Sequence, residues 1–102
     1  MEMTKTKNTE QIAKDKACAI VMQKGTLSEA QNAFNQLYKR YNVGLSYHIK
    51  KFGGFDEEDV QDLTQEVFTK VFEKIQQYNP ASAFSTWLYH IATNHVIDCK
   101  RK

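Results

Sequence analysis

The sequence has few of the residues that make turns, with four glycines and one proline among 102 residues. A β-sandwich or barrel needs a turn about every 8–12 residues, so this scarcity argues against both architectures. Collagen-like and low-complexity chains are excluded as well. Because 41% of the residues are hydrophobic and 25% are charged, the chain has enough apolar material for one modest core and a single domain.

Long apolar runs and a cysteine framework are also missing. No run approaches the roughly 18 residues of a membrane span, and the charged N-terminus is not followed by the apolar stretch of a secretory signal. Two cysteines, Cys18 and Cys99, lie 81 residues apart and make no disulfide framework. We therefore expect a reduced, cytoplasmic protein with no membrane partner.

The net charge of +2 conceals a strong asymmetry along the chain. Residues 53–79 carry seven acidic and two basic side chains, whereas the segments 1–24, 25–52 and 80–102 carry net charges of +2, +3 and +2. A DNA-binding domain is usually more uniformly basic. The pattern suits a protein with two different macromolecular partners, although acidic residues at the start of a helix also suit the helix dipole and can be merely solvated.

Apolar residues recur at helical spacing in four segments, which predicts an all-α fold. The first helix is expected over residues 10–24, after a flexible polar tail at residues 1–9. The second begins at Thr26, which has the spacing of a capping box with Glu29. Its apolar stripe continues to residue 52, where a pair of glycines ends it.

The third predicted helix begins after Asp56, which can act as its N-cap. It ends at the step from Asn79 to Pro80, because the residue before a proline resists the α conformation. A short loop follows, and Ser82 is the expected N-cap of a fourth helix over residues 83–102. The expected architecture is therefore a compact all-α bundle of about four helices around one aromatic-rich core.

No catalytic constellation is recognisable in the sequence, so we predict that the chain is not an enzyme. His95 and Cys99 lie four residues apart, but no second pair completes the ligand set of a zinc site, so we expect a packed His95, no metal and no cofactor. The carboxylates of Asp59, Asp62 and Glu66 share one face of the third helix. Without a basic or metal partner, the residues themselves predict only a solvated face.

The fourth predicted helix has the residue types of a nucleic-acid surface. Asn side chains read base edges, aromatic rings stack on unpaired bases, and Lys and Arg hold phosphates. Residues 84–102 combine aromatic side chains, neutral hydrogen-bonding side chains and a basic end. The alternative is that Phe84 and Trp87 belong to the core and the rest is ordinary surface.

Motifs at fixed spacings cover the last two predicted helices and the loop between them. They are DLTQEVF at residues 62–68, YNP at 78–80, FSTWLYHIATN at 84–94 and ID at 97–98. This pattern resembles region 2 of bacterial sigma factors, in the extracytoplasmic-function (ECF) branch. The resemblance covers about residues 28–102 and implies a region 2 helical domain within residues 10–102.

The resemblance implies two binding surfaces. Region 2 binds the coiled-coil clamp helices of the largest subunit of RNA polymerase, and it captures the melted −10 element of the promoter. The residues implied to face the polymerase are Asp59, Asp62, Gln65 and Glu66. Their acidic segment would meet a basic coiled coil through charge-assisted bonds.

The DNA side is implied to combine the loop with the fourth helix. The loop cups a flipped base of the non-template strand, the helix follows that strand, and the basic end holds phosphates. The residues implied are Asn79, Pro80, Ala81, Ser82, Ser85, Thr86, Tyr89, His90, Asn94, Lys100 and Arg101.

The chain also departs from the family pattern. Housekeeping sigma factors carry a tandem Trp wedge three positions beyond Trp87, where this chain has His90 and Ile91. We therefore expect weaker melting, a narrower promoter set, and a Trp87 that is mostly core. Full members also have a region 4 that reads the −35 element. This chain has no counterpart of it, so we expect the domain alone to bind promoter DNA poorly.

The leading hypothesis is the promoter-recognition domain of an alternative sigma factor, with core RNA polymerase, −10 promoter DNA and an anti-sigma factor as partners. The alternative is a helical module that binds only protein, as a sigma-like decoy for polymerase or for an anti-sigma factor. A polar fourth helix with Asn94 and a basic end favours DNA reading over the decoy.

Overall fold

The computed structural model describes the backbone of residues 2–101 and the side chains of residues 9–101. Within this part of the chain there are four α-helices, one short 3-10 turn and no β-strand. The elements are α1 (Glu2–Lys24), α2 (Leu27–Lys50), α3 (Glu57–Lys74), η1 (Ile75–Gln77) and α4 (Phe84–Arg101). The predicted all-α fold is confirmed. None of the helices in the described part combines the length and hydropathy of a membrane span.

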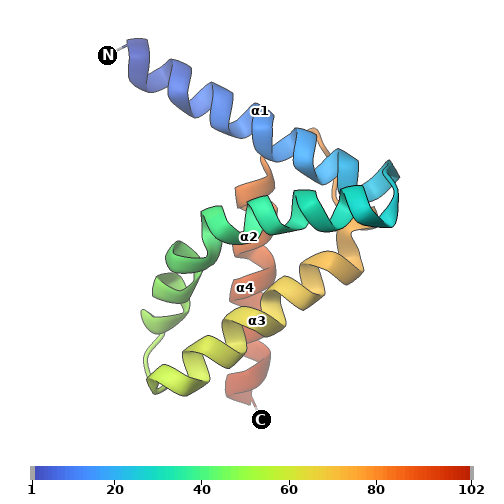
Figure 1. Cartoon of the computed structure of the whole chain (residues 1–102). Helices are drawn as coiled ribbons and strands as arrows, with labels where there is room; N and C mark the ends of the chain where they lie inside the picture. The colour runs from blue at the N-terminus through green and yellow to red at the C-terminus, as the bar shows by residue number, and fades with distance from the viewer. Residues whose placement is uncertain (1, 102) are drawn as a thin grey trace.

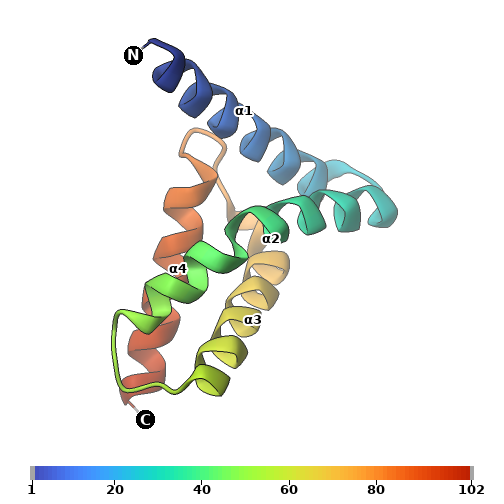
Figure 2. The same ribbon diagram turned by 60° about the vertical axis from the view of Figure 1, so that its left-hand side comes forward.

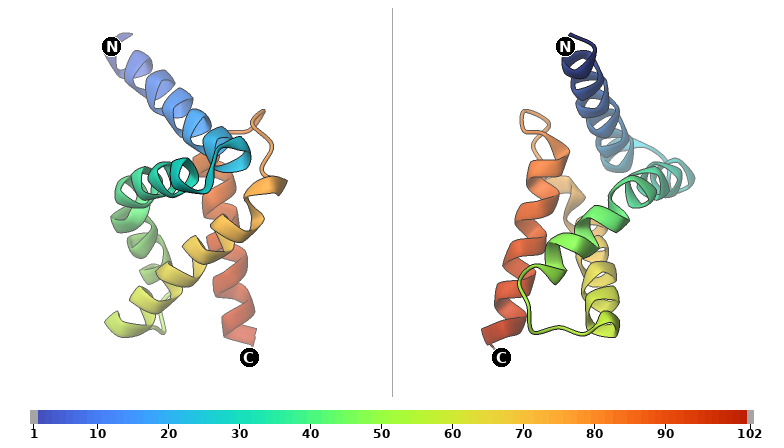
Figure 3. Two further views of the ribbon diagram at one scale, coloured as in Figure 1. Left: turned by 45° about the vertical axis from the view of Figure 1, so that its right-hand side comes forward. Right: turned by 90° about the vertical axis from the view of Figure 1, so that its left-hand side faces the viewer.

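Three of the helices form a small bundle, and the fourth, α1, extends beyond it. α2, α3 and α4 pack together, and α1 lies across one end of them (Figure 1). α3 and α4 run antiparallel and side by side, and the loop between η1 and α4 lies next to α1 (Figure 2). The N-terminal part of α1 extends beyond the other helices in both views of Figure 3.

α1 is longer than the apolar pattern predicts. It begins at Glu2 instead of residue 10, so the predicted boundary is wrong and the segment expected to be a polar tail is helical from Glu2 onward. No glycine or proline interrupts residues 2–24. Polar residues such as Lys, Gln and Glu are good helix formers, so a polar composition alone does not end a helix.

The ends of α2 and α3 follow the sequence signals. The Thr26 hydroxyl accepts from the Glu29 N–H at 3.2 Å, and the Glu29 carboxylate accepts from the Thr26 N–H at 2.9 Å, which is the predicted capping box. The Asp56 side chain caps α3 by accepting from the Asp59 N–H at 2.8 Å. Between the two helices, the glycine pair 53–54 has φ values of 75° and 82°, which glycine adopts without steric cost.

The start of α4 differs from the prediction. The helix begins at Phe84, so Ala83 occupies the position before it and the predicted N-cap, Ser82, lies in the loop. The Ser82 carbonyl accepts a hydrogen bond from the Tyr78 hydroxyl at 2.5 Å. Ser82 therefore helps to close the loop and does not cap the helix.

Apolar side chains from all four helices fill one core. The contribution of α4 is a stripe of four residues with no exposed surface, spaced four apart and therefore on one side of the helix. This buried stripe consists of Phe84, Leu88, Ala92 and Val96. On the other side of the core, the Phe34 and Tyr38 rings of α2 pack edge-on against Phe68 of α3.

α2 bends near its middle, between its teal and green parts (Figure 1). A Cβ at Gly44 would lie 2.9 Å from the Tyr89 hydroxyl oxygen, closer than van der Waals contact allows. The Ser46 hydroxyl donates to the Asn42 carbonyl at 2.9 Å, a bond of the kind that bends helices. The missing side chain at residue 44 thus leaves room for the Tyr89 hydroxyl of α4.

A buried carboxylate ties α1 to α2. Asp15 is 2% exposed and accepts hydrogen bonds from the Arg40 guanidinium at 2.5 Å, from the Gln11 amide at 3.1 Å and from the Tyr41 hydroxyl. Burial and the bond to Asp15 raise the pKa of Tyr41, so its phenol stays protonated and can donate. These partners offset the cost of removing a charge from water.

Replacing Asp15 with Asn should lower the free energy of unfolding by about 2 kcal/mol, because a hydrogen bond to a charged group contributes about 1.5–3 kcal/mol. Urea unfolding followed by circular dichroism measures the change. Lys14→Gln, on the exposed neighbouring residue, is the matched control and should leave stability nearly unchanged. Equal unfolding midpoints for the two variants would show that Asp15 does not hold α1 in place.

Candidate nucleic-acid interface and acidic surface

The buried stripe of α4 determines which side chains face outward. At about 100° per residue, the side of α4 opposite the buried stripe holds Thr86, His90, Asn94, Ile97 and Arg101. All five are exposed. Four of them belong to the predicted DNA-binding set, and we call these four the outer stripe (Thr86, His90, Asn94 and Arg101). The exposed Ile97 side chain lies between Asn94 and Arg101 on the same side.

The loop before α4 meets the start of the outer stripe in a shallow hollow of about 240 Å³. Its lining consists of Gln77, Tyr78, Asn79, Ser82, Thr86, Trp87 and His90. The Asn79 carboxamide oxygen accepts from the Ala81 N–H at 2.9 Å, which makes an Asx turn and shapes the loop. The hollow thus brings together four predicted DNA-binding residues, and Pro80 and Ala81 reach the surface of the same loop.

α1 and the core aromatics hold this loop. The Gln23 side-chain amide donates to the carbonyls of Ile75 and Tyr78, both at 2.8 Å. The Tyr78 ring is 3% exposed and packs against Phe84 and Trp87, with ring centroids 5.8 and 5.3 Å away. Burial raises the pKa of Tyr78, so the hydroxyl keeps the proton that it donates within the loop.

The sequence did not predict the roles of Trp87 and Gln23 at this hollow. Trp87 was expected to be mostly core, but it is only partly buried and lines the hollow. The role of Gln23 has no local signal at all, because its partners lie more than 50 residues away. Both features depend on the loop folding back over the first turn of α4, and helical periodicity does not describe such a contact.

Three of the predicted DNA-binding residues face α2 or its following loop. Ser85 and Tyr89 are partly buried, and the Tyr89 ring packs edge-on against His48 with centroids 5.0 Å apart. The Lys100 ammonium donates to the Gly53 carbonyl at 3.0 Å. The structure therefore divides the predicted set into the outer stripe with its hollow and an inner flank that contacts the fold.

The predicted polymerase-facing residues share the outer face of α3. Asp59, Asp62, Gln65 and Glu66 are all exposed, and we call them the acidic surface. The residues that alternate with them at helical spacing, including Val60, Leu63 and Val67, are buried. Three of the four also line an open groove beside α4.

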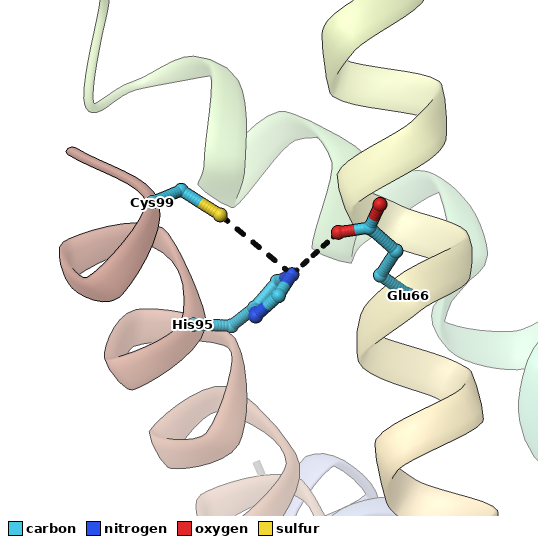
Figure 4. Close-up of side chains that lie close together, drawn as sticks. All are labelled: Glu66, His95 and Cys99. Carbon is cyan, nitrogen blue, oxygen red and sulfur yellow. Dashed lines mark hydrogen bonds and ion pairs between the residues drawn. The ribbon is translucent and has the colours of Figure 1, made fainter. Parts of the chain in front are cut away.

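One carboxylate of the acidic surface has a partner that the sequence did not predict. Glu66 Oε1 lies 2.7 Å from His95 Nε2, and Cys99 Sγ lies 3.9 Å from the same nitrogen (Figure 4). The expectation of a carboxylate without a basic partner is therefore wrong for Glu66. Because α3 and α4 lie antiparallel, residues 29 positions apart meet, and spacing within either helix could not reveal this contact.

Comparison with known proteins identifies this arrangement. Residues 37–102 match the family model for sigma-70 region 2. The chain belongs to this family. The region 2 domain is 34% identical over 71 residues to the RNA polymerase sigma factor CnrH of Cupriavidus metallidurans, covering 70% of this chain and 37% of that protein. It is 38% identical over 64 residues to the ECF RNA polymerase sigma-E factor of Escherichia coli K12, covering 63% and 32%.

These relatives confirm the predicted resemblance to the ECF branch, and the chain spans about a third of their length. Solved structures share the fold of the region 2 domain. An engineered region 2 of sigmaE, in complex with GTAAAA, has a TM-score of 0.71 and 32% identity over 82% of each chain. CnrH, in complex with the cytosolic domain of CnrY, has a TM-score of 0.72 and 30% identity, covering 83% of this chain and 52% of that one.

Proposed function

We propose that this region 2 domain recognises and melts the −10 element of promoters for an alternative, ECF-type sigma factor, and that it binds core RNA polymerase in the cytoplasm. The observation that carries the proposal is the exposed outer stripe beside the loop hollow, in a family member whose solved relative binds GTAAAA. The proposed role is binding and positioning, with no catalytic step of its own.

The loop hollow is the proposed site for an extruded base of the non-template strand. Extruding a base costs a few kcal/mol of unstacking, which a fitted pocket has to offset. The partly exposed Trp87 ring offers a stacking surface, and stacking on an aromatic side chain contributes about 1–3 kcal/mol per base. Because Gln23 and Tyr78 hold the loop in place, little ordering entropy is lost on binding.

The outer stripe is the proposed reader of the neighbouring bases. The Asn94 carboxamide offers a donor and an acceptor side by side, which is what a base edge requires. Arg101, at the end of the helix, is placed to hold a backbone phosphate. Ser85, Tyr89 and Lys100 contact the fold and would contribute at the edge of this surface.

The acidic surface is the proposed contact with polymerase, through the clamp coiled coil of the largest subunit. Its carboxylates are exposed and lie on α3, whereas the outer stripe lies on α4. The polymerase and the DNA would therefore bind different helices. Since the solved relative CnrH is in complex with the cytosolic domain of CnrY, we also propose an anti-sigma factor as a partner. A decoy that binds only protein would have no use for an exposed Asn94 amide on the same side of α4 as the residues that line the loop hollow.

Glu66→Lys should abolish the retention of this chain on immobilised core polymerase, because the reversed charge would face a basic coiled coil. Glu10→Lys makes the same charge change on an exposed residue of α1 and is the matched control. Circular dichroism checks that both variants stay helical. Equal retention of the two variants would remove Glu66 from the polymerase contact.

Asn94→Ala should reduce the preference for GTAAAA over its single-base variants by about 1–3 kcal/mol at one position, while binding to the weaker sequences changes little. Arg101→Ala is the contrasting variant, since loss of a phosphate contact should weaken all sequences alike and lower the salt slope by about 1. Fluorescence anisotropy with single-stranded oligonucleotides at low salt measures both. Uniform loss in the Asn94 variant would make this residue a backbone contact, and no DNA binding at all by the unaltered chain would favour the decoy.

A further inference from the structure

We propose that Glu66, His95 and Cys99 form a binding site for a thiophilic divalent metal ion of the Zn²⁺ class. A carboxylate oxygen, an imidazole nitrogen and a thiol sulfur come together from α3 and α4, and the three donor atoms lie within 4.8 Å of one another (Figure 4). These are the three donor types that Zn²⁺ takes in proteins, and three protein ligands with a water in the fourth position is a common set. Sequence spacing alone offered only two of them.

The donor atoms are already near the separations that a tetrahedral ion requires. With metal bonds of about 2.0–2.1 Å to nitrogen and oxygen and about 2.3 Å to sulfur, an oxygen and a nitrogen ligand lie about 3.3 Å apart, and a nitrogen and a sulfur about 3.6 Å. The corresponding distances are 2.7 Å from Glu66 to His95 and 3.9 Å from Cys99 to His95. The third pair, Glu66 and Cys99, lies within 4.8 Å, so the exposed Glu66 side chain has to move away from His95 and toward Cys99 to complete the set.

Packing holds two of the three ligands in place. His95 and Cys99 lie one turn apart on α4, flanking the buried stripe, and both are partly buried. Glu66 reaches them from α3 across an open groove, which leaves room for water or another ligand. The charged residues that line this groove are Asp62, Glu66, Glu73 and Lys70. Their net negative charge favours a cation at this position.

A hydrogen-bonded link between the two helices is the competing explanation of the same contacts. The two explanations differ in the state of the sulfur. When a metal binds, the S–H bond of Cys99 breaks, the proton goes to solvent and the thiolate donates its electron pair to the ion, while His95 binds through an unprotonated Nε2. A hydrogen-bonded link keeps the thiol and has no dependence on metal concentration.

Metal occupancy would also affect the acidic surface. Glu66 would be bound to the ion and unable to accept hydrogen bonds from a polymerase partner, so metal should oppose polymerase binding. This consequence rests on the proposed function, whereas the metal site itself does not.

Titration of the chemically reduced chain with Co²⁺, used as a spectroscopic substitute for Zn²⁺, tests the site. We expect one equivalent of Co²⁺ to produce a thiolate-to-cobalt charge-transfer band that excess Zn²⁺ removes. Cys99→Ser should abolish this band, and His95→Ala, which removes a direct ligand, should weaken Co²⁺ binding by more than the roughly tenfold that the loss of an outer-shell partner costs. Because the serine variant changes one atom, it should keep the fold even if the alanine variant does not, and circular dichroism checks this.

The chain provides matched controls for both ligands. Cys18→Ser changes the other thiol, whose pKa is raised by burial, and His90→Ala changes an exposed histidine of the same helix. Both variants should bind Co²⁺ like the unaltered chain. The proposal is overturned if the unaltered chain gives no thiolate band, or if the band survives in Cys99→Ser. Since this titration contains no polymerase, its failure is separate from a failure of the Glu66→Lys retention experiment.

Discussion

Burial of a single stripe of α4 fixes the orientation of everything in the candidate site. The stripe consists of Phe84, Leu88, Ala92 and Val96. Each large apolar side chain in it contributes about 1.5–3 kcal/mol on burial, so rotation of the helix about its axis is strongly opposed. With the stripe held against α2 and α3, Asn94 faces outward and His95 faces α3. One packing constraint therefore determines both the proposed DNA-reading row and the contact between the two functional helices.

Hydrogen bonds from α1 stabilise both α2 and the loop before α4. The buried Asp15 joins it to α2, and Gln23 joins it to the two carbonyls that flank the start of the loop. The loop hollow is consequently held from three sides, by α1, by the core aromatics and by its own Asx turn. A pre-ordered loop suits the capture of an extruded base, because the cost of ordering has already been met in folding.

Local sequence signals predicted the four helices and the exposed face of α3 well. The capping box at Thr26 and the cap at Asp56 are read from neighbouring positions, and the structure has both of them. The start of α1 was misplaced because polar residues carry no periodic signal, although they form helices readily. Ser82 was misassigned because the loop closes one residue later than its capping preference indicates.

Contacts between elements could not be predicted from the same signals. The pairing of Glu66 with His95, the support of the loop by Gln23 and the inward position of Tyr89 all depend on how α1, α2 and α3 pack on α4. The family resemblance supplied the residue types of the two surfaces but not their division into an outer stripe and an inner flank. The proposed metal ligands, Glu66, His95 and Cys99, likewise come together only because α3 packs on α4.

The central claim is that α3 and α4 present two separate binding surfaces, and NMR titration of the ¹⁵N-labelled chain tests it most directly. One titration uses GTAAAA, and the other uses a fragment containing the clamp coiled coil of bacterial RNA polymerase. The oligonucleotide should shift amides of the loop at residues 79–82 and of the outer stripe, and the coiled coil should shift amides of residues 59–66. Shifts on the same helix face with both ligands, or shifts with neither, would contradict the claim.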